Sequence, residues 1–451
     1  MVFTGIFFTF PAWQAKAADT KYAGISLLPG NAIRYYAMEK IKLGIMREGR
    51  VPPDKRVPLT PLKCEETAAA FPNVEIIIQP SPLRSYADQE YRDLGFTVQE
   101  DVSDCTILMG VKEVPVPDLI PNKTYLFFSH TIKKQPHNQP LLQAILRKNI
   151  TLIDYELLTN GQGERLVAFG YYAGVVGAYN GLLTYGKKWQ LFDLKPAWQC
   201  LDMADMEEEF FKVRALPPIK IAVTGGGRVS NGALDLLSQM GIRRVSVFDY
   251  LYKEFSEPVF VQLRSSDYNT RRDGKVWDSP DFYQNPQEYI STFSKFSQVT
   301  DLLIAAAYWH PAAPRLFSLA DMREPAFKIN TIADITCDIN GSVPSTLRAS
   351  SIADPVYDFN PVTRQLEPPY SRRENVAVMA VDNLPCELPR TASRDFGRQL
   401  IDEVFPYLLG HDTEEILERA TIAKAGKLMP RYSYLQDYAE SKEPTNALVQ
   451  N

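Results

Sequence analysis

The sequence predicts an α/β protein that is built on mainly parallel sheets and divided into two domains. Short apolar runs typical of strands alternate with helical segments along most of the chain, which is the pattern of parallel strands joined by crossover helices. A strand, a glycine-rich turn and a helix begin a second series of this kind near residue 219. The length, 451 residues, exceeds what one hydrophobic core usually organises, which also favours two domains.

The first series begins with a strand at 42–47 and ends with a strand at 149–156. Runs such as NVEIIIQPS and KTYLFFSH are rich in β-branched and aromatic residues, which favours strands. The pattern predicts further strands at 73–81, 105–115 and 123–130, and helices around 62–70 and 139–148.

The second series follows a helix of small residues, GYYAGVVGAYNGLLTYGKKW, which begins at Gly170. Its first strand is predicted at 219–224, and VSVFDY is predicted to be the next strand, ending on Asp249. The polar and aromatic residues 251–298 indicate an insertion. Two apolar runs within 299–309 and 328–338 resemble buried parallel strands, and the tail from Gly410 is predicted to be helical and polar.

Composition excludes several classes of function. The net charge of −5 and the absence of a basic stripe argue against a nucleic-acid partner. No apolar run reaches the 18 residues of a membrane span. The five cysteines, at 64, 105, 200, 337 and 386, form no CxxC pair, which argues against a zinc site and disulfides and favours a reducing, cytoplasmic location. No metal site is predicted.

The first 37 residues differ from the rest of the chain. A short apolar stretch and the small-residue site Ala15-Lys16-Ala17 loosely resemble a secretory signal. No Lys or Arg precedes the apolar stretch, however, and Pro11 interrupts its end. The alternative interpretation is an extension that is not part of the native protein, with the true start near Met38.

The glycine-rich turn predicts a dinucleotide site. Gly225, Gly226 and Gly227 follow the strand directly, and Asp249 lies 24 residues beyond the first of them. Strand, tight turn, helix and distal acid are the context that the dinucleotide fingerprint requires, although the last glycine is displaced to Gly232. A carboxylate at Asp249 would bind the ribose 2′-hydroxyl and favour NAD. Arginines that fold back would instead permit NADP; the candidates are Arg243, Arg244, Arg271 and Arg272.

Charged side chains follow the strands of the first series where each strand ends. Because the carboxyl ends of parallel strands line one edge of a sheet, these groups are expected to face one ligand site. An imidazole at such an edge transfers protons near neutral pH, and neighbouring cations bind carboxylates. The residues are Arg56, Lys112, Glu113, His130, Asp154 and Glu156. Each also has a structural explanation, because a lone histidine is commonly a hydrogen-bonded loop residue and Lys112–Glu113 resembles a solvated pair.

Nine motifs occur in the order found in a known family: KRVPLTP, GVKEVP, KTYLFFSHTIK, IDYELL, RLVAFGYYAG, GGGRVSNGA, AAYW, ADITCDINGS and AVDNLPCELPRTAS. Over residues 42–410 the chain resembles the lysine-forming saccharopine dehydrogenases, above all the lysine–ketoglutarate reductase half of the aminoadipic semialdehyde synthases. Alanine dehydrogenase and the transhydrogenase alpha subunit are more distant relatives. The resemblance implies two Rossmann-like domains with a cleft between them. Residues 38–169 and about 375–451 would form the substrate domain, and 170–374 the NAD(P) domain.

The resemblance also implies roles for individual residues. Lys112 and His130 match the acid/base pair, while Arg56 and Arg165 match arginines that bind substrate carboxylates. Glu113 and Glu156 match carboxylates that temper the positive charge of the site. The cofactor would be bound by Gly225, Gly226, Gly227, Arg228, Ser230, Gly232, Asp249, Tyr308, Asp338 and Asn383.

The expected function is therefore NAD(P)-dependent interconversion of saccharopine with lysine and 2-oxoglutarate. Two alternatives stay open: an alanine-dehydrogenase-like enzyme that aminates a small 2-oxo acid, and a nucleotide-binding subunit without catalysis. The cations Arg56, Lys133, Lys134 and Arg165 outnumber what one small carboxylate requires, which favours the larger substrate. The expected partners are small molecules, and the oligomeric state is left open.

Overall fold

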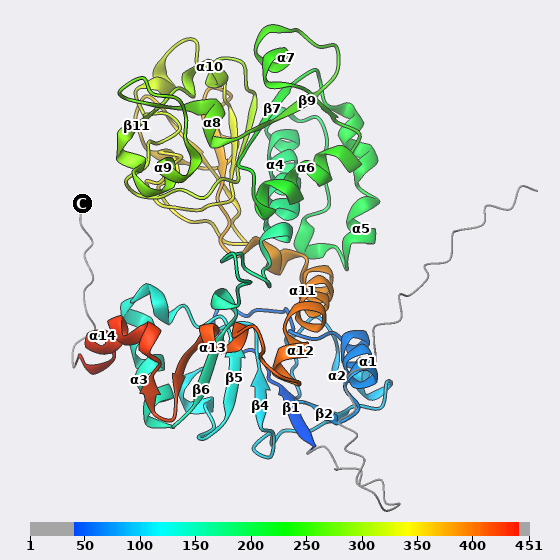
Figure 1. The fold of residues 1–451 in the computed structure, drawn as a ribbon. Helices are drawn as coiled ribbons and strands as arrows, with labels where there is room; N and C mark the ends of the chain where they lie inside the picture. Colours follow the sequence, from blue (N-terminus) through cyan, green and yellow to red (C-terminus); the bar gives the residue numbers. More distant parts are fainter. Residues whose placement is uncertain (1–39, 442–451) are drawn as a thin grey trace, which may run out of the picture. The chain divides into compact units, whose positions relative to one another are not determined.

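The computed structural model describes residues 40–441, so the predictions for the N-terminal 37 residues lie outside the described residues. The described chain contains two eight-stranded sheets with helices packed on them (Figure 1). The predicted α/β class with two domains is confirmed. Within residues 40–441, no helix is long and apolar enough to span a membrane.

The first sheet has the order β18-β17-β6-β5-β4-β1-β2-β3. Its strands β1 to β6 pair in parallel, whereas β17 runs antiparallel to β6 and β18 antiparallel to β17. The C-terminal segment thus completes the first sheet, and the prediction of a purely helical tail is wrong. The strands are β1 (Ile41–Ile45), β2 (Val74–Ile78), β3 (Thr97–Val98), β4 (Ile107–Met109), β5 (Thr124–Phe127), β6 (Thr151–Asp154), β17 (Thr421–Lys424) and β18 (Lys427–Leu428).

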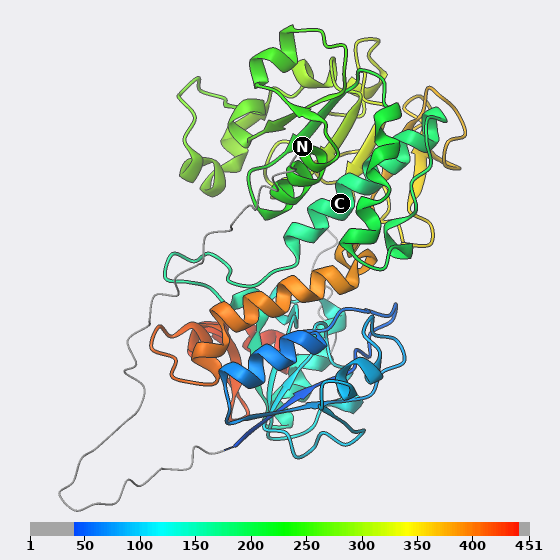
Figure 2. The same cartoon turned by 90° about the vertical axis from the view of Figure 1, so that its right-hand side faces the viewer.

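Helices cover both faces of this sheet. Figure 2 shows α1 and α11 together on one face, where the Cβ that Gly397 lacks would lie 3.0 Å from the Lys63 side chain. Thr60 and Pro61 begin α1, since the threonine hydroxyl accepts the backbone N–H of Lys63 at 3.3 Å. The helices are α1 (Pro61–Ala70), α2 (Asp88–Arg92), α3 (Gln139–Arg147), α11 (Pro389–Glu403), α12 (Phe405–Leu408), α13 (Ile416–Ala420) and α14 (Gln436–Glu440).

The second sheet has the order β15-β14-β16-β13-β12-β7-β9-β8, and only β14 and β15 run antiparallel to their neighbours. β16 belongs to this sheet, so the chain returns to the first sheet after Met379, later than the predicted position near 375. The strands are β7 (Lys220–Thr224), β8 (Arg243–Arg244), β9 (Val259–Leu263), β12 (Leu302–Ala305), β13 (Thr331–Asp334), β14 (Val356–Phe359), β15 (Leu366–Glu367) and β16 (Val376–Met379).

The segment after β8 differs from the prediction. VSVFDY is not a strand: β8 ends at Arg244, and Asp249 lies on the helix α7 (Val247–Tyr252). The Ser246 hydroxyl accepts the backbone N–H of Asp249 at 3.0 Å, and this N-terminal cap prevails over the β-branched pattern. β8 pairs with β9 rather than with β7.

Residues 251–298 are therefore not wholly an insertion, because β9 is an interior strand of the second sheet. Residues 251–258, which include the end of α7, and the part after β9 lie outside the sheet. The part after β9 contains most of the additional structure. It comprises a two-stranded hairpin and three short helices, namely α8 (Ser265–Tyr268), β10 (Asn269–Arg271), α9 (Ser279–Gln284), β11 (Tyr289–Ser291) and α10 (Ser294–Ser297).

The helices α4 (Gly170–Trp189) and α6 (Arg228–Gln239) are in close contact. A Cβ on Gly174 would lie 1.8 Å from the Val229 carbonyl oxygen, and one on Gly232 would lie 2.0 Å from that of Tyr171. Such a distance excludes any side chain, so both positions require glycine. The structure thus gives Gly232, predicted as a cofactor residue, a packing role. The helix α5 (Met203–Glu207) follows α4 along the chain.

Candidate active site

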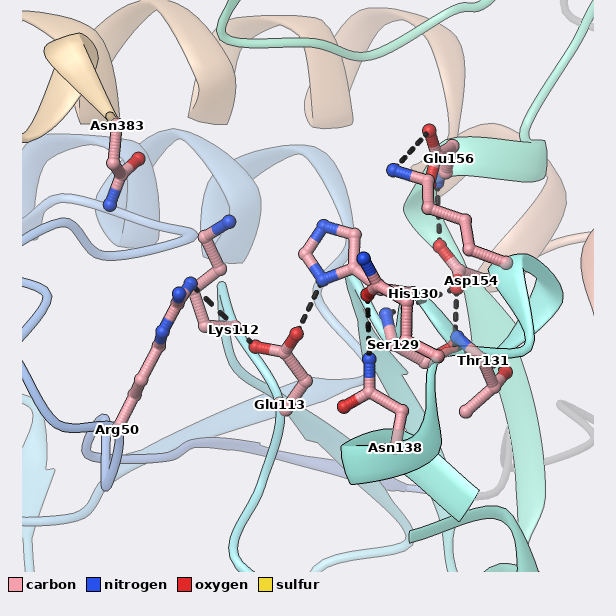
Figure 3. A network of polar contacts seen from close by, with 12 residues as sticks. Arg50, Lys112, Glu113, Ser129, His130, Thr131, Asn138, Asp154, Glu156 and Asn383 are labelled. Atoms are coloured by element: carbon pink, nitrogen blue, oxygen red, sulfur yellow. Dashed lines mark hydrogen bonds and ion pairs between the residues drawn. The ribbon is translucent and has the colours of Figure 1, made fainter. Parts of the chain in front are cut away.

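The carboxyl ends of β1, β4, β5 and β6 bring together the predicted acid/base residues (Figure 3). Lys112 and Glu113 follow β4, and His130 follows β5 on the neighbouring strand. Glu156 follows β6, which is next in the sheet. The parallel register therefore places the ends of distant sequence segments at one edge.

His130 and Glu113 form an ion pair through Nδ1 and Oε1. His130 has φ +51°, a left-handed conformation that turns the chain sharply out of β5. Its ring stacks on Phe128 with centroids 6.4 Å apart. Because a carboxylate at Nδ1 favours the tautomer with its proton there, Nε2 is left to accept or donate a proton.

Glu113 keeps its negative charge in this environment. Burial raises the pKa of its carboxyl, but the hydrogen bond and the charge of His130 outweigh burial and leave the pKa lowered. The other oxygen, Oε2, is buried without a hydrogen bond, and the Arg50 guanidinium lies 3.9 Å from it. A buried polar atom that lacks a hydrogen bond at a sheet edge can be satisfied by a polar ligand.

The ammonium of Lys112 makes no hydrogen bond or ion pair with any residue between 40 and 441. Burial lowers its pKa, and the charges of Arg56 and Arg50 act in the same direction, while Glu113 opposes them. Figure 3 shows the Lys112 side chain next to the His130–Glu113 pair. A lysine with a lowered pKa and no partner is suited to donating a proton at neutral pH.

Arg56 is buried, with 2% of its surface exposed. Asp54 accepts from its Nε at 3.0 Å and from its Nη2 at 2.6 Å, and the Phe169 ring lies 4.2 Å from the guanidinium carbon. Burial would lower the pKa of Arg56, but the charge of Asp54 prevails and holds it above its usual value. Asn383, predicted among the cofactor residues, accepts from Nη2 at 2.9 Å and so contacts the predicted substrate arginine.

A second cationic cluster lies at the end of β6. Glu156 Oε1 lies 3.4 Å from Lys133 Nζ and 3.8 Å from Arg165 Nη1. Glu156 Oε2 and Arg165 Nε are buried and form no hydrogen bond with any residue between 40 and 441. Burial lowers the pKa of Arg165, against the charge of Glu156. The structure thus provides two separate arginines for anionic groups, Arg56 and Arg165.

The sequence analysis missed two acidic residues here. Glu48, which follows β1, accepts the backbone N–H of Val111 at 2.6 Å and that of Lys112 at 2.9 Å. Burial and the charge of Asp54 raise the pKa of Glu48 to about 8. Asp54 was missed as the partner of Arg56. Glu48 shares the strand-end position of the residues that were found, so the same signal applied to β1 would have identified it.

The glycine turn has room for a phosphate group. Gly225 has φ +105°, and a Cβ there would lie 3.1 Å from Ala307 Cα, whereas nothing lies within 4 Å of a Cβ on Gly226 or Gly227. The turn leads directly into α6, whose first residue is Arg228, and the Ser230 hydroxyl donates to the Gly227 carbonyl at 2.9 Å. An open glycine turn at a helix N-terminus fits a dinucleotide pyrophosphate.

The other predicted cofactor residues lie at different places. Tyr308 follows β12 and is 80% exposed, and Asp338 is exposed after β13. Asp249 pairs with Lys253 at 2.8 Å on α7. The strand beside β7 is β9, and Arg264 follows its end with an exposed side chain that has no partner among the described residues.

Comparison with known proteins identifies the first domain. Residues 44–176 match the family model "Alanine dehydrogenase/PNT, N-terminal domain". A solved L-alanine dehydrogenase, 18% identical, covers 88% of this chain and 100% of its own with a TM-score of 0.60, and the Sinorhizobium meliloti transhydrogenase reaches 0.52 at 13% identity. Both likenesses show the alanine dehydrogenase fold.

Curated relatives confirm the resemblance that the motifs indicated. The alpha-aminoadipic semialdehyde synthase of Arabidopsis thaliana is 30% identical over 87% of this chain and 41% of its own length. The mitochondrial enzyme of that name from Bos taurus is 28% identical, over 91% and 49%. The chain thus spans less than half the length of these two relatives. The Yarrowia lipolytica saccharopine dehydrogenase [NAD(+), L-lysine-forming] is 25% identical, over 84% and 95%. The cytoplasmic location stays a prediction.

Proposed function

We propose that this chain is a nicotinamide-nucleotide-dependent oxidoreductase that interconverts saccharopine with lysine and 2-oxoglutarate. The observation that carries the proposal is the His130–Glu113 ion pair beside the Lys112 ammonium, which has no partner in the described part of the chain, at one edge of the first sheet. The alanine dehydrogenase/PNT domain and the saccharopine-related relatives support it.

The charges around this pair favour a substrate with several carboxylates. Saccharopine has three carboxylates. Arg56 follows β1 and Arg165 follows β6, and each provides a planar guanidinium that can bind a carboxylate. Arg56 Nη1 has no acceptor in the described part of the chain, and Arg165 Nε is buried without one. A small 2-oxo acid would engage only one of these groups.

The residues of the chain perform the proton transfers. Joining the lysine ε-amine to the 2-oxoglutarate carbonyl requires loss of water through a carbinolamine. His130 Nε2 takes the proton that the amine nitrogen loses on bonding to the carbonyl carbon and returns it to the carbonyl oxygen, which becomes the carbinolamine hydroxyl, while Glu113 stabilises the imidazolium that forms. Lys112 donates to the oxygen that leaves as water. The glycine turn at Gly225 to Gly227 would hold a nicotinamide cofactor, which would supply the hydride that reduces the imine.

We further propose that the cofactor is NADP rather than the NAD that Asp249 favours. In a dinucleotide fold, the residue that binds the ribose lies at the end of the strand next to the one that leads into the glycine turn. Here the glycine turn follows β7, and that neighbouring strand is β9. The residue at that end is Arg264, a partner for a 2′-phosphate, whereas Asp249 follows the edge strand β8 and pairs with Lys253.

The test is reduced-cofactor oxidation, followed by absorbance, with lysine plus 2-oxoglutarate and separately with pyruvate plus ammonium. Turnover with the lysine pair alone would support the proposal, and saccharopine should appear as the product. Turnover with pyruvate and ammonium alone would replace it with an alanine-dehydrogenase-like activity. Cofactor binding without either turnover would indicate a nucleotide-binding subunit.

A further inference from the structure

A cavity of about 400 Å³ lies on the second domain, and none of its lining residues is assigned above to substrate or cofactor. Its walls come from α4, from the segment 196–198, from the segments around β14 and β16, and from the 3-10 turn Leu384–Glu387. This volume is in the range of small-molecule sites. Most of the wall is apolar, with Leu183, Ile352, Val356 and Met379 among its residues.

A single buried carboxyl group faces this apolar cavity. Glu387 is 2% exposed and lines the wall. One of its oxygens accepts from Asn180 Nδ2 at 2.9 Å, and the other has no hydrogen-bond partner among residues 40–441. Burial raises the pKa of Glu387 to about 7. The second oxygen is not among the enclosed polar atoms, so it stays accessible from the cavity, where a ligand can form a hydrogen bond with it.

The other charged groups of the wall are already paired. Lys187 Nζ lies 3.3 Å from Asp193, and Asp354 accepts from Arg348 at 2.9 Å. The remaining titratable group is the phenol of Tyr370, whose pKa burial raises to about 12. No cation therefore neutralises Glu387 within the described residues. A ligand with a positive charge would balance the charge of its carboxylate.

We propose that this cavity binds a small organic ammonium compound, whose apolar body fills the cavity and whose ammonium pairs with Glu387. Charge complementarity defines this class. An anion would face a carboxylate without a counter-charge, and a neutral apolar molecule would leave the free oxygen unsatisfied. The inference depends on no step of the proposed reaction, because binding is measured directly.

The experiment is isothermal titration calorimetry of the full chain with n-hexylamine, with n-hexanol as the neutral probe of matched length. We expect saturable binding of the amine with one site per chain, and binding of the alcohol at least about tenfold weaker, since a charged hydrogen bond is lost. No binding of the amine, or equal binding of both probes, would overturn the proposal.

Two variants and a pH series complete the test. Glu387→Gln should weaken amine binding by about tenfold or more, and Glu324→Gln, at an exposed position, should not change it. In the wild type, affinity should fall as the pH is lowered from about 8 to about 6, because Glu387 takes up a proton while the amine stays charged. The pH series uses the wild-type protein, so it does not depend on the folding of a variant. An affinity for the amine that is independent of pH would show that Glu387 does not bind it.

Discussion

Glu48 accepts the backbone N–H groups of Val111 and Lys112 with its two carboxyl oxygens, and so it fixes the end of β4 from which the Lys112 side chain leaves. Its carboxyl group is close to the Asp54–Arg56 pair, whose charges act on its pKa. One side chain thus links the lysine proposed as proton donor to the arginine proposed as substrate ligand.

This relationship predicts a stability change with pH. The pKa of Glu48 is raised to about 8 in the folded state, so the folded state holds its proton more tightly than the unfolded state does. Wild-type stability should therefore fall, relative to Glu48→Gln, as the pH rises from about 5 to about 8. Urea unfolding across this range measures the difference, and parallel curves would exclude the raised pKa.

Removing the imidazole should affect chemistry and not cofactor binding. His130→Ala is expected to lower kcat by about a hundredfold or more, as the loss of a general acid–base group does. His137→Ala is the matched control because His137 is exposed and its side chain forms no hydrogen bond or ion pair within residues 40–441, and its kcat should be unchanged. Cofactor affinity, measured by fluorescence titration, should be the same in both variants. Normal turnover in His130→Ala would take His130 out of the mechanism.

Arg165 is expected to determine affinity for a substrate carboxylate. Arg165→Ala should raise KM for 2-oxoglutarate or saccharopine by about tenfold or more, because a charged hydrogen bond contributes about 1.5–3 kcal/mol. Exposed Arg147 on α3 provides the control, since Arg147→Ala removes the same charge from the first domain away from the edge. Steady-state kinetics decides, and an unchanged KM would show that this arginine binds no substrate.

Two single variants separate the proposals for cofactor choice. If Arg264 binds the 2′-phosphate, Arg264→Ala should weaken NADPH binding by about tenfold and leave NADH binding unchanged. If Asp249 binds the ribose 2′-hydroxyl instead, Asp249→Ala should reduce the ratio of NADH affinity to NADPH affinity. Arg264→Ala should then leave both affinities unchanged. The dissociation constants of both cofactors for both variants distinguish these outcomes.

The elements with a strong local signal were predictable from the sequence. The helix 170–189 has the predicted bounds, and the strand ends that carry Lys112, His130 and Glu156 lie together as expected. The parallel pattern specifies this edge because each strand end is marked by the change from apolar to charged residues.

What the sequence could not provide depended on contacts between distant segments. The strand-like pattern of VSVFDY gave way to a serine cap, and the place of β9 beside β7 has no local signature. Asn383 could not be assigned to Arg56 because 327 residues separate them, and the fold alone brings them together. Glu48 is the opposite case, because its position as a charged residue just after a strand is visible in the sequence and was overlooked.

The place of β9 also bears on how the second sheet assembles. β8 pairs only with β9 in the described sheet, although it precedes β9 in the chain. During synthesis β8 therefore has no strand to join until residues 259–263 have emerged, and the edge of β7 stays open until then. An unpaired apolar edge strand is a site of aggregation. Chains that stop between β8 and β9 are consequently expected to aggregate, whereas those that include β9 cover this edge of β7, whose other edge is covered once β12 has emerged.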